Sequence, residues 1–127
     1  MKLTTFTPKS IDVRLSSKFV GKYGLLYLFS CTLSVNNNSD SEITMIGKHW
    51  YIYSNQNKPL EIIGEGFNGE SPILLPKTSF SYENILPLHT AFASIKSNYT
   101  LRLSNNYNKI FKIDAPLIDL TPTPFLN

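Results

Sequence analysis

Residues 25–35 read LLYLFSCTLSV, and every odd position of this stretch carries an apolar or aromatic side chain. Serine or threonine fills the even positions from 30 to 34. A period of two is that of a β-strand, so the odd face, including Cys31, is predicted to lie on a core. The polar run NNNSD at residues 36–40 is typical of a turn and predicts where this strand ends.

A second strand is predicted from Ile43 to Tyr53, and it carries the only tryptophan, Trp50. Further extended segments are expected at 11–15, 60–63, 79–83, 91–103 and 109–115, with a hairpin loop at 104–108. About seven to eight short strands separated by turns predict an all-β protein, namely an immunoglobulin or fibronectin type III-like β-sandwich. A closed β-barrel is the alternative.

Length and composition limit the class of protein. The chain has 127 residues, of which 42% are hydrophobic and 17% charged, and this suits a single domain with its own core. That domain is predicted over 1–127, with its core at about 11–120 and a loose tail at 121–127. A net charge of +3 is too small to predict nucleic-acid binding, and one cysteine forms no internal disulfide. Because no apolar run is long enough for a signal peptide or a membrane span, we expect a cytoplasmic protein.

The sequence GEGFNG at residues 64–69 has the glycine spacing of dinucleotide-binding loops. Such loops lead directly into a helix, and Pro72 and Pro76 argue against a helix here. We therefore interpret the glycines chiefly as corners of a tight loop, although backbone N–H groups in such a loop can also bind an anion. The predicted anion or partner contacts are Gly64, Glu65, Gly66, Phe67, Asn68 and Gly69. Three lysines are expected to offset the glutamates nearby: Lys48, Lys58 and Lys77.

A second candidate surface lies on the strand that contains Trp50. His49 precedes this tryptophan, so the period of two places the two side chains on opposite faces of the sheet. His49, Tyr51 and Tyr53 then share the outward face and are predicted to form a partner-binding patch. Neither His49 nor His89 has partners at metal-ligand spacing, and no nucleophile–base arrangement is apparent. The sequence therefore assigns no catalytic residue and no metal ligand.

Four sequence blocks, in this order, resemble the ApaG domain family: KHW at 48–50, GEGFNGESPILLP at 64–76, FSY at 80–82 and IKSNYTL at 95–101. That family typically has a basic residue before His-Trp, then Gly-Glu-Gly-x-x-Gly-x-x-Pro, and then Phe-x-Tyr. The resemblance covers about residues 11–120. The chain departs from the family at Lys77, which replaces a glycine, and at Ala91 and Ala93, which replace a proline and a glycine.

The resemblance implies a fibronectin type III-like sandwich. Because the sequence shows no catalytic constellation and the family occurs as an added domain, we expect a binding module that is not an enzyme. The family is linked to cobalt resistance and magnesium efflux, and related domains fused to other proteins look like protein-binding modules. We therefore expect an unidentified protein partner, no cofactor, no nucleic acid and no membrane, with a homodimer as a further option. The alternative is a protein that binds pyrophosphate or nucleotides at the glycine loop, or a weak phosphohydrolase. A third hypothesis is a divalent-cation sensor built on His49 and the glutamates.

Overall fold

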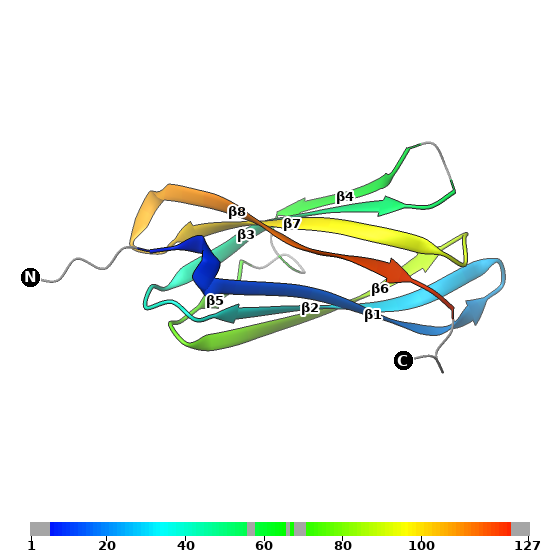
Figure 1. Cartoon of the computed structure of the whole chain (residues 1–127), viewed down its shortest axis with the longest axis horizontal. Coiled ribbons are helices and arrows are strands. Elements are labelled where there is room, and N and C mark those ends of the chain that lie inside the picture. Colours follow the sequence, from blue (N-terminus) through cyan, green and yellow to red (C-terminus); the bar gives the residue numbers. More distant parts are fainter. Residues whose placement is uncertain (1–5, 56–57, 66, 68–70, 123–127) are drawn as a thin grey trace, which may run out of the picture.

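The computed structural model of the chain describes residues 6–55, 58–65, 67 and 71–122. Within these ranges the chain consists almost entirely of β-strands joined by turns (Figure 1). The elements are η1 (Pro8–Ser10), β1 (Ile11–Tyr23), β2 (Leu26–Asn37), β3 (Ile43–Tyr53), β4 (Leu60–Glu65), β5 (Ile73–Leu74), β6 (Thr78–Leu88), β7 (Ala93–Leu103) and β8 (Asn106–Leu120). Since the 3-10 turn η1 is the only helix in the described ranges, no helix there is long enough to cross a bilayer.

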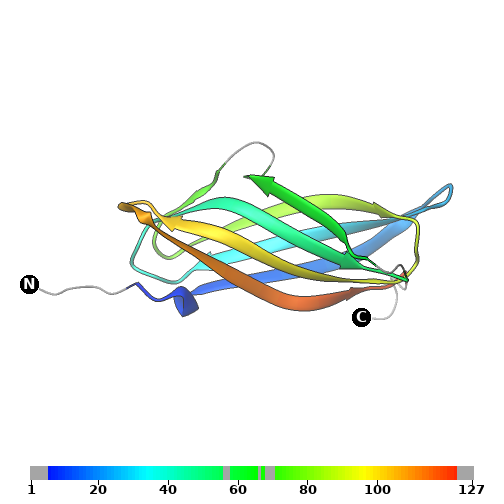
Figure 2. The same ribbon diagram turned by 90° about the horizontal axis from the view of Figure 1, so that it is seen from above.

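The strands form two antiparallel sheets that face each other. One sheet has the order β1-β2-β6, and the other has the order β4-β3-β7-β8, with β5 beside β4 on the same edge of β3. Figure 2 shows the second sheet with its strands side by side in this order. The chain crosses between the sheets after β2, β5 and β6. A three-stranded sheet facing a five-stranded one, in which β5 has only two residues, forms a fibronectin type III-like sandwich. The predicted fold is therefore confirmed, and the closed barrel is wrong.

The core lies between the sheets and is filled by alternate residues of the strands. On β2 the side chains of Phe29, Cys31, Leu33 and Val35 are fully buried, as the odd-face pattern predicts. Leu25 is 80% exposed, so the inward position predicted for it is wrong. It lies in the turn between β1 and β2, and Figure 2 shows that this hairpin projects beyond the end of the sandwich, where no facing sheet covers it.

Two strands are longer than the sequence predicts. β1 continues from the predicted end at Leu15 to Tyr23, and β6 continues from Glu83 to Leu88. Both extensions contain polar residues that pair with β2, with one register shift between Phe19 and Gly21 of β1. Hydrogen bonding to a neighbouring strand therefore lengthens these strands where the apolar alternation gives no signal.

The last hairpin also differs from its prediction. β7 and β8 are joined by a turn at 104–105, which is shorter than the predicted loop at 104–108. β8 was expected to end at Ala115 but runs through Pro116 to Leu120. A register shift between β7 and β8 accommodates the proline, which lacks the N–H that regular pairing needs.

Candidate functional site

The outward face of β3 carries an ordered group of aromatic side chains. Trp50 and Ile52 on β3 are buried, so the residues between and beside them point away from the core. The rings of His49 and Tyr51 stack on this outward face with centroids 4.0 Å apart and an interplanar angle of 17°. The Nε2 atom of His49 lies 2.8 Å from Oε1 of Glu61 on β4, so the imidazole is held on two sides.

Exposed apolar surface continues on both sides of this stacked pair. Ile63 on β4 lies directly across from His49 in the sheet, and its side chain is 71% exposed. Tyr53 lies at the end of β3, on the same outward face, and is 42% exposed. We define the outer patch by its five residues: His49, Tyr51, Tyr53, Glu61 and Ile63. The structure thus places the three residues predicted for a partner surface on one face and adds two from β4.

The glycine loop is only partly within the described residues. Gly64 and Glu65 belong to β4 and pair with Lys48 and Gly47 on β3. Phe67 is 3% exposed and makes edge-on contacts with two rings of β6, those of Phe80 at 5.7 Å and Tyr82 at 5.1 Å. The Phe67 side chain therefore belongs to the core. Gly66, Asn68 and Gly69 lie outside the described residues, so a ligand contact by this loop stays a prediction. As expected, no helix follows in residues 71–77, where β5 forms instead.

Lys48 connects the loop to the opposite sheet. Its ammonium group donates a hydrogen bond of 3.0 Å to the hydroxyl of Tyr82. It also lies 4.4 Å from the ring centroid of Tyr82 and 5.2 Å from that of Phe67. The lysine stem runs beside Gly64, where a Cβ atom would lie in van der Waals contact with Cε of Lys48 at 3.4 Å. Lys48 thus closes the side of the sandwich between β3 and β6, above the buried ring of Phe67.

The other two lysines expected near the loop lie elsewhere. Lys77 donates to the carbonyl oxygen of Asn38 at 2.7 Å and lies 3.6 Å from a carboxylate oxygen of Asp40. Lys58 precedes β4, and Gly64 is near the other end of that strand. Only Lys48 is therefore next to the described part of the loop.

Replacing Lys48 with methionine is expected to lower the free energy of unfolding by about 1 kcal/mol. Methionine keeps an apolar stem over Phe67 but loses the hydrogen bond to Tyr82 and the attraction of the ammonium group to the rings. Urea unfolding measures the change, and Lys112→Met on the exposed side of β8 is the matched control. Equal effects of the two substitutions would contradict the structural role of Lys48.

Metal and nucleophile chemistry has few candidate groups. Among the side chains that the structure describes, no three of His, Cys, Asp or Glu lie together as a metal site would need. The side chains of Glu65 and Glu70 lie outside those described, so the cation-sensor hypothesis stays a prediction. Cys31 is fully buried, and burial raises the pKa of its thiol to about 11. The thiol therefore stays protonated at neutral pH, which makes it a poor nucleophile.

A further hollow was not predicted from the sequence. It lies between the β3–β4 hairpin and the end of β6 and has a volume of about 370 Å³. We call it the hairpin cleft and define it by its lining residues: Ile52, Ser54, Lys58, Pro59, Leu60, Pro87, Leu88, His89 and Thr90. His89, which the sequence places in a loop, lies in the turn after β6 and forms part of this lining.

Comparisons with known proteins identify relatives of the whole sandwich. The chain is 30% identical to Protein ApaG of Beijerinckia indica over 123 residues, which are 97% of this chain and 85% of that protein. It is 34% identical to Protein ApaG of Shewanella piezotolerans over 79 residues. The latter match spans 62% of this chain and 63% of the Shewanella protein, less than two thirds of its length.

Two solved structures have the same fold. An X-ray structure of a Northeast Structural Genomics Consortium target superimposes with a TM-score of 0.85 at 24% identity and covers 96% of this chain and 94% of that one. The crystal structure of an ApaA protein from Bordetella pertussis gives a TM-score of 0.78 at 23% identity, covering 87% of this chain and 92% of that one.

A family model agrees with these relatives. The model of the ApaG domain matches residues 22–103, a range that runs from the end of β1 to the end of β7 and includes the KHW block and the glycine loop. On this evidence the chain belongs to the ApaG domain family.

Proposed function

We propose that this chain is a binding module, not an enzyme, and that its outer patch contacts a protein partner. The observation that carries the proposal is the stacked pair of His49 and Tyr51, with rings 4.0 Å apart, held on an exposed sheet face by the contact of His49 with Glu61. Both side chains lie on the outward face of β3, opposite the buried Trp50 and Ile52, so filling the core does not by itself account for the stacking.

The chemistry of the outer patch suits a protein surface. Aromatic residues are enriched in interfaces because a ring gives a large contact area with few rotatable bonds. Stacking holds both rings before a partner arrives, which reduces the entropy lost on binding. Ile63 and Tyr53 add exposed apolar area, and Lys96 and Asn98, which lie across from Tyr51 and His49 on β7, add a polar border.

Two observations support the non-enzymatic part of the proposal. The imidazole of His49 lies on the outward face of β3, whereas the thiol of Cys31 is buried between the sheets, so these two groups do not meet. A general base and a nucleophile must instead lie within hydrogen-bond reach of one reacting group.

The test uses affinity capture from cells that naturally produce the chain. The bait carries His49→Ser and Tyr51→Ser together, which removes the stacked pair from an exposed face. The matched control is Tyr23→Ser, because Tyr23 is 76% exposed but lies in the other sheet. We expect recovery of the partner to fall at least about tenfold with the double variant and to stay unchanged with the control. Equal recovery with all baits would contradict the proposal, provided that circular dichroism shows each bait folded.

A further inference from the structure

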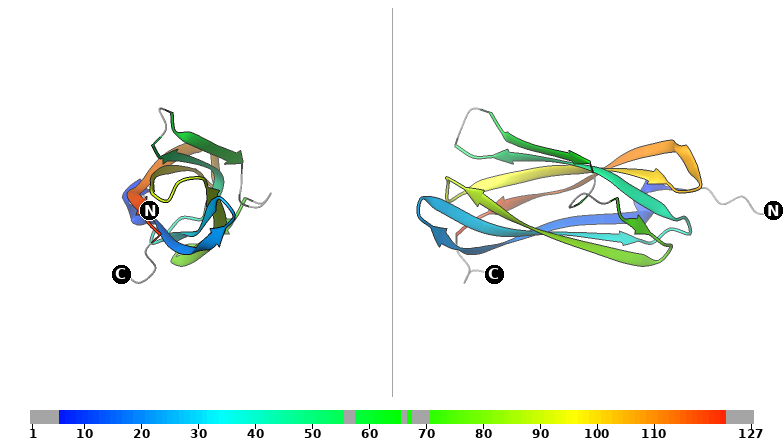
Figure 3. Two further views of the ribbon diagram at one scale, coloured as in Figure 1. Left: turned by 90° about the vertical axis from the view of Figure 1, so that its right-hand side faces the viewer. Right: turned by 180° about the vertical axis from the view of Figure 1, so that it is seen from behind.

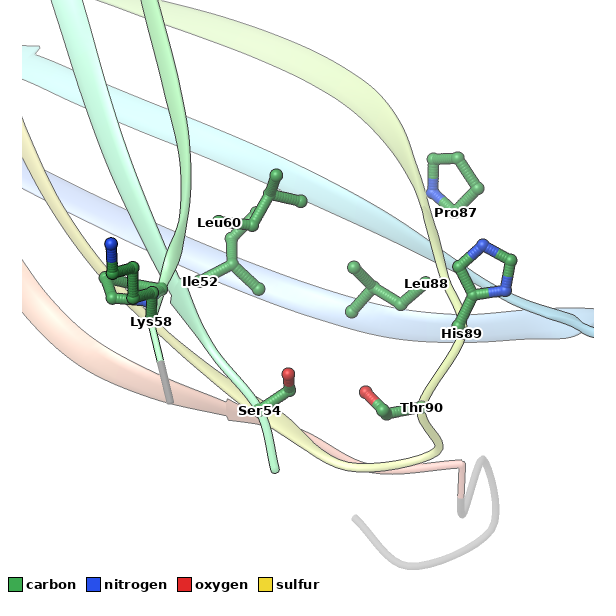
Figure 4. Close-up of a pocket in the computed structure, with 9 residues that line it drawn as sticks. Ile52, Ser54, Lys58, Leu60, Pro87, Leu88, His89 and Thr90 are labelled. Carbon is green, nitrogen blue, oxygen red and sulfur yellow. The ribbon is translucent and has the colours of Figure 1, made fainter. Parts of the chain in front are cut away.

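The hairpin cleft exists because β4 extends beyond the facing sheet. That sheet ends at β6, whereas β4 lies outside β3 and pairs only with it among the described residues. Figure 3 shows the β3–β4 hairpin standing away from the facing layer, and Figure 4 shows the space that remains between this hairpin and the end of β6. The cleft is thus produced by the unequal widths of the two sheets.

The floor and walls of the hairpin cleft are apolar and stiff. Ile52 and Leu88 form a floor of the core itself, with 2% and 6% exposure, and Leu60 at 54% extends it toward solvent. Pro59 stands in one wall and Pro87 in the other. Proline has a fixed φ angle, which reduces the backbone conformations open to both walls and so the entropy lost on binding. A volume of about 370 Å³ is at the small end of the range for ligand cavities.

The polar groups of the cleft favour a negatively charged ligand. Lys58 stands on the hairpin side and His89 on the β6 side, and Figure 4 shows the hydroxyl groups of Ser54 and Thr90 between them. The Thr90 hydroxyl donates a hydrogen bond of 3.2 Å to the carbonyl oxygen of Phe92, so the donor role falls to Ser54. None of the nine lining residues is Asp or Glu. By contrast, another hollow on the described surface is lined by two acids, Asp40 and Glu42.

We propose that the hairpin cleft binds a carboxylate carried on a short apolar group. Lys58 supplies the positive charge from the hairpin side, Ser54 donates a hydrogen bond to the carboxylate, and the apolar floor holds the tail. A single lysine matches the one negative charge of a carboxylate, whose oxygens also accept a hydrogen bond from a hydroxyl group. Such a carboxylate occurs in two sources, a free carboxylic acid or the C-terminus of a peptide. The site is separate from the outer patch, so it does not depend on the function proposed above.

The first test is an NMR titration of the full chain with hexanoate, following backbone amide shifts. We expect saturable shifts at Ser54, Lys58 and Thr90 with a dissociation constant of about 1 mM. Hexanamide has the same tail without the charge, and hexylamine has the opposite charge. Both are expected to leave these shifts unchanged up to roughly 20 mM. Shifts that fail to saturate with hexanoate, or that are equal for all three compounds, would overturn the proposal.

Two variants at exposed positions test the separate parts of the site. Lys58→Met is expected to weaken hexanoate binding at least about fivefold, whereas Lys112→Met on β8 leaves it unchanged. Leu60→Ser is expected to weaken hexanoate binding by a similar factor because it removes part of the apolar floor. If hexanoate bound equally well to Lys58→Met and to the unaltered chain, the ligand class would be wrong.

A peptide with a free C-terminus distinguishes the two sources of the carboxylate. N-acetyl-Thr-Val-Leu can add to the edge of β4 as an extended strand while its carboxylate enters the cleft. Binding at least about fivefold tighter than that of hexanoate, lost with the C-terminal amide, would identify a peptide terminus. Equal affinity for peptide and hexanoate would identify a small acid. Either result supports carboxylate recognition, and the absence of binding by both would exclude it.

Discussion

Replacing Trp50 with alanine is expected to lower the free energy of unfolding by about 4 kcal/mol. Trp50 is the largest fully buried side chain of the sandwich and is 1% exposed. Its indole Nε1 donates a hydrogen bond of 3.0 Å to the hydroxyl of Tyr99 on β7, which is itself fully buried. The substitution opens a cavity at the centre of the core and removes a donor from a buried phenol, so two costs add.

Urea unfolding followed by circular dichroism measures this change. Tyr99→Phe removes the hydrogen bond and leaves the packing intact, so its cost is expected to be smaller, about 1–2 kcal/mol. Burial raises the pKa of the Tyr99 phenol to about 12, so the hydroxyl stays protonated in any ordinary buffer. A loss below about 2 kcal/mol for Trp50→Ala would contradict the central place of this side chain in the core.

Replacing Asn37 with aspartate is expected to lower the free energy of unfolding by about 3 kcal/mol or more. Asn37 ends β2 and is fully buried. Its Nδ2 atom donates to three carbonyl oxygens, at 2.8 Å on Ser41, 3.1 Å on Leu74 and 3.2 Å on Leu75. Its Oδ1 atom accepts from the amide and hydroxyl of Ser39 at 3.0 and 2.6 Å. Aspartate keeps the acceptors but places a carboxylate against carbonyl oxygens.

The adjacent residue is the matched control for this substitution. Asn38 is exposed, so Asn38→Asp makes the same change of charge one position away and is expected to change stability by less than about 0.5 kcal/mol. Both variants add a negative charge, but only Asn37→Asp removes the buried Nδ2 donor. The difference between their free energies of unfolding, measured by chemical denaturation, therefore reports the buried site. If the two variants were equally stable, Asn37 would not hold the end of β2, the following turn and β5 together.

Much of the fold can be predicted from the period of two alone. The bounds of β3 agree with the prediction at both Ile43 and Tyr53, because apolar positions and turn residues mark both ends. The prediction fails where the position of neighbouring strands, and not the alternation of apolar residues, determines where a strand begins and ends. Leu25 continues the apolar pattern of β2 but lies past the end of the facing sheet, and this depends on the lengths of strands distant in the sequence.

The sequence predicts the β3 residues of the outer patch but not those of β4. The face shared by His49, Tyr51 and Tyr53 follows from alternation within one strand. The contact of His49 with Glu61 depends on the register between β3 and β4, which alternation within a strand does not fix. The turn signal at 54–59 indicates a hairpin and was the only clue to this neighbour. The hairpin cleft depends on the relative widths of two sheets, and no local sequence signal reports that.

Site-specific photo-cross-linking in the producing cells tests the central claim most directly, namely that the outer patch is the surface that meets a protein. A benzophenone amino acid replaces Tyr53 in one sample and Tyr23 in another, so that two exposed tyrosines on different sheets are compared. We predict a discrete cross-linked protein at position 53, at least about fivefold stronger than at position 23. A cross-link that forms equally at both positions, or only at position 23, would contradict the claim.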